Sequence, residues 1–239
     1  MGFNPKKLKR VRREIIEKFA GKITVFVHNP LFSEISPVEV NKGEAIKYIA
    51  RMLNIDMNHV AACGDAGNDV DAFKACKLSA AVGLCHKNVI ANASYHIKKA
   101  KNSVSKFINN YVLADKPTVK MVVTDLDGTF YTDAEKNVVK EAITVVKATV
   151  PEKIKYFCIA SGRSAAYTFR AIESLGIKDH KNMFIIGVNG AAVYDVENYK
   201  EIYATRLKHK DVKRLFDIYD EISKKVKMGM IIHNYDNVK

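Results

Sequence analysis

Two aspartates that follow an apolar run have the spacing for phosphate chemistry. The stretch MVVTDLDGTF at residues 121–130 carries Asp125 and Asp127, one residue apart, into a Gly-Thr turn. Carboxylates at a strand end can attack phosphorus and move protons. We expect Asp125 to be the nucleophile, and Asp127 to protonate the leaving oxygen and then activate water. The pair therefore indicates phosphoryl transfer.

Polar residues also follow other apolar runs of the sequence. They are Asp65, Asn68 and Asp69 after Cys63, and Ser161, Gly162 and Arg163 after Ala160, while Lys42 begins the helix before Cys63. In an open α/β sheet, catalytic groups collect outside the carboxyl ends of the strands. We therefore expect Ser161 and Asn68 to hydrogen-bond phosphate oxygens, with Lys42 adding positive charge.

Several carboxylates at one sheet edge repel one another unless a cation lies among them. A hard cation with oxygen ligands is needed, and Mg²⁺ fits. The expected ligands are Asp125, Asp127, Asp65 and Asp69.

Each of these assignments has a plainer alternative. Asp65, Asn68 and Asp69 alone could be a helix cap and turn. Arg163 and Asn189 are weaker candidates, since an arginine after a strand is as often in a surface ion pair as in contact with substrate.

The elements that must position these residues alternate between strands and helices. Beyond short apolar runs around residues 60–63, 78–84 and 94–98, the expected elements are a hairpin at 23–35, strands at 119–124, 155–160, 183–188, 201–206 and 228–233, and helices at 43–53, 103–111, 134–149, 165–175 and 211–226. This alternation predicts an α/β fold with a mostly parallel sheet.

Composition favours a globular intracellular protein. The chain has 239 residues, 48% of them hydrophobic, with no run long enough to span a bilayer and no apolar N-terminal signal. We expect a cytoplasmic location and reduced, packed cysteines. The formal charge is +13, and seven lysines and arginines crowd the first 18 residues. Leu8, Val11, Ile15 and Phe19 recur there at helical spacing, which favours an amphipathic helix with a basic solvated face over a nucleic-acid footprint. We expect neither a nucleic-acid nor a membrane partner.

Four segments together resemble the motifs of the haloacid dehalogenase superfamily: DLDGT, ASGR, the lysine of NKGEA, and GDAGND. Their spacing is similar to that of its Cof-like phosphatases. The resemblance implies a Rossmann-like core with a parallel sheet and an α/β cap, which here is incomplete. It also implies phosphate or substrate binding by Asn68, Gly128, Gly162, Arg163 and Asn189. The departures, at Ala66, Ala72 and Ser161, remove no functional group.

The motifs stand in inverted order relative to that family. We expect residues 1–38 to be the end of the cap, 39–112 the second half of the core, 113–118 a linker, 119–195 the first half of the core, and 196–239 the start of the cap. A circular permutant and a slice through a tandem array both explain this order, and the slice accounts better for the incomplete cap. One chain is expected to complete its own sheet as a monomer, with a swapped dimer as the alternative.

The predicted function is a magnesium-dependent phosphatase. Its substrates would be small phosphorylated metabolites such as sugar phosphates, hydrolysed through an aspartyl-phosphate. The alternatives are a phosphosugar mutase, which uses the same aspartate pair, and a catalytically silent fragment or interaction module that keeps the motifs without assembling them.

Overall fold

The computed structural model describes residues 4–29, 31–98, 102–114, 118–131 and 140–224. The chain forms two compact units. The first holds described residues 4–40 and 205–224, and the second holds 41–204. The unit boundaries thus fall after Val40 and Ala204, whereas the sequence analysis expects the cap to end at 38 and to begin again at 196.

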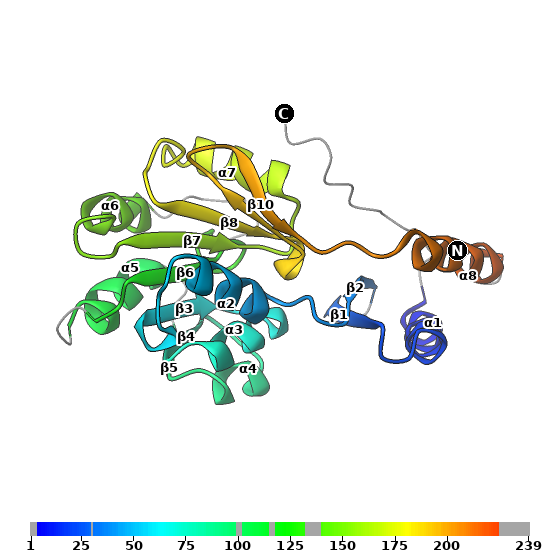
Figure 1. Ribbon diagram of the computed structural model, residues 1–239. Helices are drawn as coiled ribbons and strands as arrows, with labels where there is room; N and C mark the ends of the chain where they lie inside the picture. The colour runs from blue at the N-terminus through cyan, green and yellow to red at the C-terminus, as the bar shows by residue number, and fades with distance from the viewer. Residues whose placement is uncertain (1–3, 30, 99–101, 115–117, 132–139, 225–239) are drawn as a thin grey trace. The chain divides into compact units, whose positions relative to one another are not determined.

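An eight-stranded sheet runs through the second unit (Figure 1). Its strands, in spatial order, are β10 (Lys200–Ala204), β9 (Ala192–Asp195), β8 (Met183–Gly187), β7 (Tyr156–Ala160), β6 (Met121–Asp125), β3 (Val60–Gly64), β4 (Leu78–Val82) and β5 (Tyr95–Ile97). Strands β8 to β5 are all parallel, and β9 and β10 are antiparallel additions at one edge. The prediction of an α/β fold with a mostly parallel sheet is confirmed.

The two halves of the chain meet at the pairing of β3 with β6. The register runs from Val60 opposite Met121 to Cys63 opposite Thr124. Strands β3 to β5 come from the first half, and β6 to β8 come from the second. One chain therefore completes a continuous sheet by itself, as expected.

Helices cover both faces of this sheet (Figure 1). One face carries α2 (Lys42–Met52), α3 (Val70–Ala75) and α4 (Lys87–Ala91), and the other carries α5 (Ser103–Phe107) with its π turn (Ile108–Val112), α6 (Lys140–Thr149) and α7 (Ala165–Ser174). Because both faces are covered, the central strands are mostly apolar rather than alternating.

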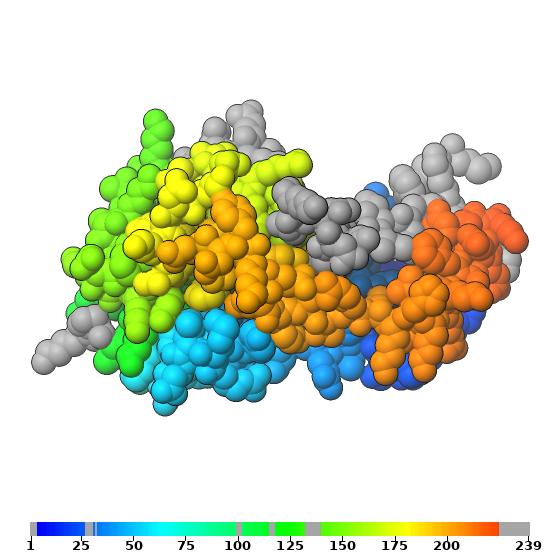
Figure 2. Space-filling model, turned by 45° about the horizontal axis from the view of Figure 1, so that its top comes forward, coloured from blue at the N-terminus to red at the C-terminus, as the bar shows by residue number. Residues whose placement is uncertain are grey.

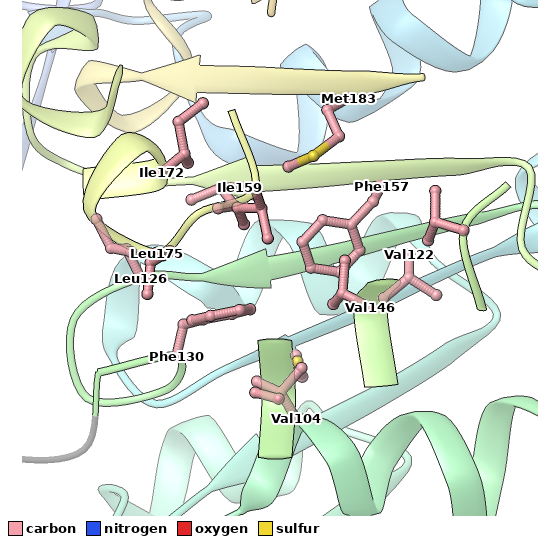
Figure 3. Close-up of a cluster of buried hydrophobic side chains, with 14 of the residues drawn as sticks. Val104, Val122, Leu126, Phe130, Val146, Phe157, Ile159, Ile172, Leu175 and Met183 are labelled. Atoms are coloured by element: carbon pink, nitrogen blue, oxygen red, sulfur yellow. The ribbon is translucent and has the colours of Figure 1, made fainter. Parts of the chain in front are cut away.

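Successive residues of a strand pack into two separate hydrophobic cores, one on each face of the sheet. Val122 packs against the α5–α7 face, and Val123 packs against the α2–α4 face. In the first core the rings of Phe130 and Phe157 meet edge to face, with centroids 6.3 Å apart (Figure 3). Val146 of α6 packs in the same core. These side chains hold the sheet against its helices.

Helix α2 also contacts the antiparallel edge of the sheet. The Tyr48 hydroxyl donates to the Ile202 carbonyl at 2.8 Å, and the rings of Tyr48 and Tyr203 lie 4.6 Å apart. Figure 2 shows α2, in light blue, beside the orange β10. This is a second place where the first half of the chain packs against the second.

Strand β9 is an element that the sequence analysis did not anticipate. A turn at Val188–Gly190 reverses the chain, so that β9 pairs antiparallel with β8. The strand expected at 201–206 is β10, and it joins this sheet. The strand expected at 228–233 lies outside the described residues, as do residues 134–139 of one expected helix and 115–117 of the expected linker.

The first unit is a small α/β assembly. It contains α1 (Pro5–Lys18), the hairpin of β1 (Ile23–Asn29) and β2 (Phe32–Pro37), and α8 (His209–Ser223). Phe19, Ile15 and Val11 pack against Ile218 and Ile222 of α8. The amphipathic first helix is therefore confirmed. Among the described residues, no helix combines the length and apolarity that crossing a membrane requires.

Truncating the core at Phe157 should destabilise the protein strongly. The side chain is fully buried, so Phe157→Ala removes its packing and leaves a cavity, and we expect a loss of about 3–5 kcal/mol in the free energy of unfolding. Urea denaturation measures this. The control Leu84→Ala, at a fully exposed side chain, should stay within about 0.5 kcal/mol of wild type. Equal effects at both positions would contradict this core.

Candidate active site

Four neighbouring strands end at the same edge of the sheet and carry most of the predicted site residues. Asp125 is the last residue of β6, and Asp65 follows β3 directly. Ser161 follows β7, and Asn189 follows β8 in the turn that precedes β9. Because these strands are parallel neighbours, their carboxyl ends lie side by side, as the sequence analysis expects.

Lys42 bridges two carboxylates at this edge. Its side chain is 1% exposed. Its ammonium donates to Asp69 Oδ1 at 2.6 Å and also to Asp125 Oδ1. The residue is placed there by the start of α2, where the Asn41 side chain caps the helix by accepting from the Glu44 amide. Lys42 and Asp69 come from the first half of the chain, and Asp125 comes from the second.

Asp69 is held by the turn in which it lies. Its Oδ2 accepts hydrogen bonds from the backbone N–H groups of Asp65 and Ala66, both at 3.0 Å. Its other oxygen faces Lys42. The turn at residues 65–69 is therefore the helix-start turn of the plainer alternative, and it also aims a carboxylate at the site.

The titration of these groups reflects their burial and their closeness. Burial lowers the pKa of Lys42, but the charges of Asp125 and Asp69 outweigh this effect and raise it above its usual value. Burial raises the pKa of Asp125 well above its usual value, and Asp69 and Asp65 raise it further. Burial and Asp69 raise the pKa of Asp65 to about 6. Burial and mutual repulsion together therefore disfavour ionisation of Asp125 and Asp65.

Three carboxylates have the geometry to hold a metal ion. One oxygen from each of Asp65, Asp69 and Asp125 lies within 4.8 Å of the others. With the Lys42 ammonium, the group has a formal charge of −2, which one divalent cation would neutralise. Oxygen ligands of this kind suit a hard cation. The residues present therefore fit a divalent metal, although Asp127, the fourth expected ligand, is not in this group.

The Asp127 carboxylate instead forms an ion pair with Arg163. Arg163 Nε donates to Oδ2 at 2.6 Å, and Nη2 donates to Oδ1 at 2.9 Å. The guanidinium also lies over the Tyr167 ring, 4.1 Å from its centroid. Burial lowers the pKa of Arg163, but its contacts with Asp127 raise it on balance. Both side chains are about 40% exposed, so this pair lies at the rim of the site.

The structure also brings together the residues expected to contact phosphate. The Asn68 amide donates to Asn189 Oδ1 at 2.7 Å, and Asn189 is fully buried. Ser161 Oγ accepts from the Arg163 backbone N–H at 3.1 Å. A Cβ on Gly162 would lie 3.2 Å from Asn189 Oδ1, so this glycine lies against the same amide.

Gly128 lets the Asp125–Asp127 turn pass close to Asp65. Its φ is +89°, and a Cβ there would be 2.5 Å from Asp65 Oδ2. A side chain at this position would meet both the strained backbone and a carboxylate. The structure therefore places Gly128 as a residue of close approach within the site.

Two residues at the site were not among the predicted ones. The Thr129 hydroxyl donates to Asp65 Oδ1 at 3.0 Å and is buried. Tyr167 lies under the Arg163 guanidinium. Thr129 stands inside the DLDGT motif, and Tyr167 stands four residues after Arg163 on the following helix. Motif membership and helical spacing were the available signals.

Comparison with known proteins identifies relatives of this chain. A family model described as "haloacid dehalogenase-like hydrolase" matches residues 1–108 and 122–238. "Putative phosphatase M6_Spy0533" of Streptococcus pyogenes is 40% identical over 57 residues, which cover 24% of this chain and 21% of that protein. "Putative phosphatase YxeH" of Bacillus subtilis is 29% identical over 111 residues, which cover 46% and 41%.

A solved structure of a haloacid dehalogenase-like hydrolase from Bacteroides thetaiotaomicron is also similar. It is 28% identical, with a TM-score of 0.35, over 39% of this chain and 35% of that one. The chain thus spans less than half the length of these two curated relatives and of this structure.

The raised pKa of Asp65 predicts a dependence of stability on pH in metal-free protein. In the folded state the pKa of Asp65 is about 6, above the unfolded value near 4. The contribution of protonated Asp65 to the free energy of unfolding is therefore fully present below pH 4 and is lost as the pH rises through 6. The unfolding free energy of wild type should fall by about 2 kcal/mol relative to Asp65→Asn across this range. Urea denaturation with a chelator present measures it. A difference that does not change with pH would contradict the prediction.

Proposed function

Because the chain belongs to the haloacid dehalogenase-like hydrolase family, we propose that it is a magnesium-dependent phosphatase of small phosphorylated metabolites. The observation that carries the proposal is the buried Lys42 ammonium between Asp69 and Asp125, with Asp65 beside them. A carboxylate for attack, a cation beside it and a place for a divalent metal are what phosphoryl transfer requires.

In the first step of the proposed reaction, Asp125 attacks the phosphorus of a phosphate ester. An Asp125 oxygen forms the new bond to phosphorus while the ester P–O bond breaks, and the leaving oxygen takes a proton from Asp127. Lys42 keeps the attacking carboxylate oriented. The products are the free alcohol and an aspartyl-phosphate on Asp125.

In the second step, water attacks this acyl phosphate. Asp127 accepts the water proton as the new P–O bond forms, and the bond from phosphorus to Asp125 breaks, which releases inorganic phosphate and restores both aspartates. Asp127 must leave its ion pair with Arg163 to do this. A bound phosphate is a natural alternative partner for the guanidinium, because arginine binds phosphate through two parallel hydrogen bonds.

Asp65, Asp69 and Asp125 would hold the magnesium ion. When bound, Mg²⁺ supplies positive charge that neutralises the carboxylates and draws charge from the phosphate oxygens. Ser161 and Asn68 would hydrogen-bond those oxygens. The fit rests on the grouping of the three carboxylates, one oxygen of each lying within 4.8 Å of the others. The raised pKa values of Asp125 and Asp65, caused first by burial and then by their carboxylate neighbours, agree with it.

The substrate and setting are further parts of the proposal. The net charge of +13 supports an anionic, phosphorylated substrate, since a positive field attracts such molecules. We assign the second unit, described residues 41–204, to the catalytic core and the first unit to a cap. A cytoplasmic location agrees with the reduced state expected for the four cysteines.

Replacing the proposed nucleophile should abolish turnover. Asp125→Asn keeps the shape of the side chain but removes the anionic oxygen that attacks phosphorus, so the hydrolysis rate should fall by roughly 10³-fold or more. A chromogenic phosphate ester with added magnesium measures this. The control Asp71→Asn removes a carboxylate outside the three-carboxylate cluster and should keep wild-type activity. Substantial turnover by Asp125→Asn, or none by wild type, would contradict the proposal.

Magnesium should stabilise the folded protein through Asp65. A ligand that binds only the folded state raises the melting temperature, by about 3–6 °C when it exceeds its dissociation constant tenfold. Asp65→Ala removes one ligand, so its melting temperature should respond much less. Thermal denaturation with and without magnesium measures both, with Asp71→Asn again as the control. An equal response from Asp65→Ala would place the ion elsewhere.

A further inference from the structure

The turn Val188–Gly190 has an unusual backbone and a central place at the site. Val188, Asn189 and Gly190 have φ values of +48°, +53° and +106° in succession. Positive φ is uncommon outside glycine and asparagine, and a β-branched residue such as valine is an outlier there. Both Val188 and Asn189 are buried. Strain of this kind persists only where the surroundings enforce it, and it concentrates at functional sites.

The backbone of this turn is tied to the Ser161 loop. The Val188 N–H donates to the Arg163 carbonyl at 2.9 Å, and the Asn189 N–H donates to the Ser161 carbonyl at 3.0 Å. The loop that carries two proposed phosphate contacts is therefore fixed by hydrogen bonds from the turn.

The turn also packs directly against the start of α2. A Cβ on Gly190 would lie only 2.2 Å from the Asn41 carbonyl oxygen and 3.1 Å from the Lys42 nitrogen. The two backbones therefore touch, and only glycine permits this approach. The position of Lys42 thus depends on the same turn.

The Asn189 side chain contacts Asn68, in the turn at residues 65–69. Its Oδ1 accepts from Asn68 Nδ2 at 2.7 Å, between residues 121 positions apart. An amide nitrogen has two N–H groups. One of them donates to Asn189, and the other has no hydrogen-bond acceptor among the described residues. The reversed amide would place the Asn68 oxygen against the Asn189 oxygen, which is repulsive. The acceptor oxygen of Asn189 therefore favours the orientation in which the nitrogen of the Asn68 amide, and not its oxygen, faces Asn189.

We propose that Asn189 is a positioning residue that orients the Asn68 amide as a hydrogen-bond donor to phosphate. This inference rests on the proposed function of the site. Asn189 is 0% exposed, so it acts through Asn68 and not by touching substrate itself. This indirect role replaces the direct phosphate or substrate contact that the sequence analysis expects of Asn189.

The test is a double-mutant cycle between Asn189→Gly and Asn68→Ala. Glycine tolerates the left-handed backbone, so Asn189→Gly removes the side chain alone. Each single variant should raise the dissociation constant of inorganic phosphate, with magnesium present, by about tenfold, which is the size of one hydrogen bond. The double variant should be no worse than Asn68→Ala, because the effect of Asn189 passes through Asn68. Additive losses would overturn the proposal.

A matched control exists at the opposite end of the same strand. Asn182 precedes β8 and also has a left-handed backbone, with φ of +61°. Asn182→Gly makes the same chemical change away from the site, so phosphate binding should stay within about twofold of wild type. If Asn189→Gly does not fold, Asn189→Ser, whose short hydroxyl cannot reach Asn68, carries the same expectation.

A spectroscopic measurement keeps the proposal separate from activity. The side-chain amide signals of Asn68, assigned by their loss in Asn68→Ala, should shift in ligand-free Asn189→Gly and stay unchanged in Asn182→Gly. Unchanged Asn68 signals in Asn189→Gly would overturn the inference even if the protein is an active phosphatase. Shifted signals and a non-additive cycle, in a chain that hydrolyses no phosphate ester, would support it while rejecting the proposed function.

Discussion

The buried ammonium of Lys42 is the interaction on which the rest of the site depends. Removing a charge from water costs several kcal/mol unless it is paired, and Lys42 is paired with both Asp69 and Asp125. One of these partners lies 27 residues away and the other 83. Loss of either partner leaves a buried charge poorly compensated. The pairing therefore links Asp125, the proposed nucleophile, in one half of the chain to a loop of the other half.

The sheet makes the pairing of Lys42 with Asp69 and Asp125 possible, and this pairing places a buried cation among carboxylates at the sheet edge. The register of β3 with β6 sets Asp125 beside the turn that holds Asp65 and Asp69. Burial is the main reason why the pKa values of Asp125 and Asp65 are raised, and the neighbouring carboxylates raise them further, because three of them face one ammonium. Membership of the haloacid dehalogenase-like hydrolase family agrees with a site built at strand ends.

Much of this arrangement is predictable from sequence because it follows from local patterns. Apolar runs such as those of β6 and β7 are continuous since both sheet faces are covered, and helical spacing gave α2 and α7 nearly to their ends. Strand β9 was not predicted, because its pairing depends on the left-handed turn at Asn189, and no periodicity in the sequence indicates such a turn. The Asn68–Asn189 and Asp127–Arg163 contacts join residues far apart in sequence, and their partners follow only from the tertiary fold.

The central claim is that one active site is assembled from both halves of the chain around Asp125. The most direct measurement is acid quenching during turnover of a labelled phosphate ester, followed by peptide mapping of the protein-bound phosphoryl group. The account predicts label on the peptide that contains Asp125, and much less label in Lys42→Met, which keeps the volume of the side chain but removes its charge. Label on another residue, or labelling of Asp125 that Lys42→Met leaves unchanged, would contradict it.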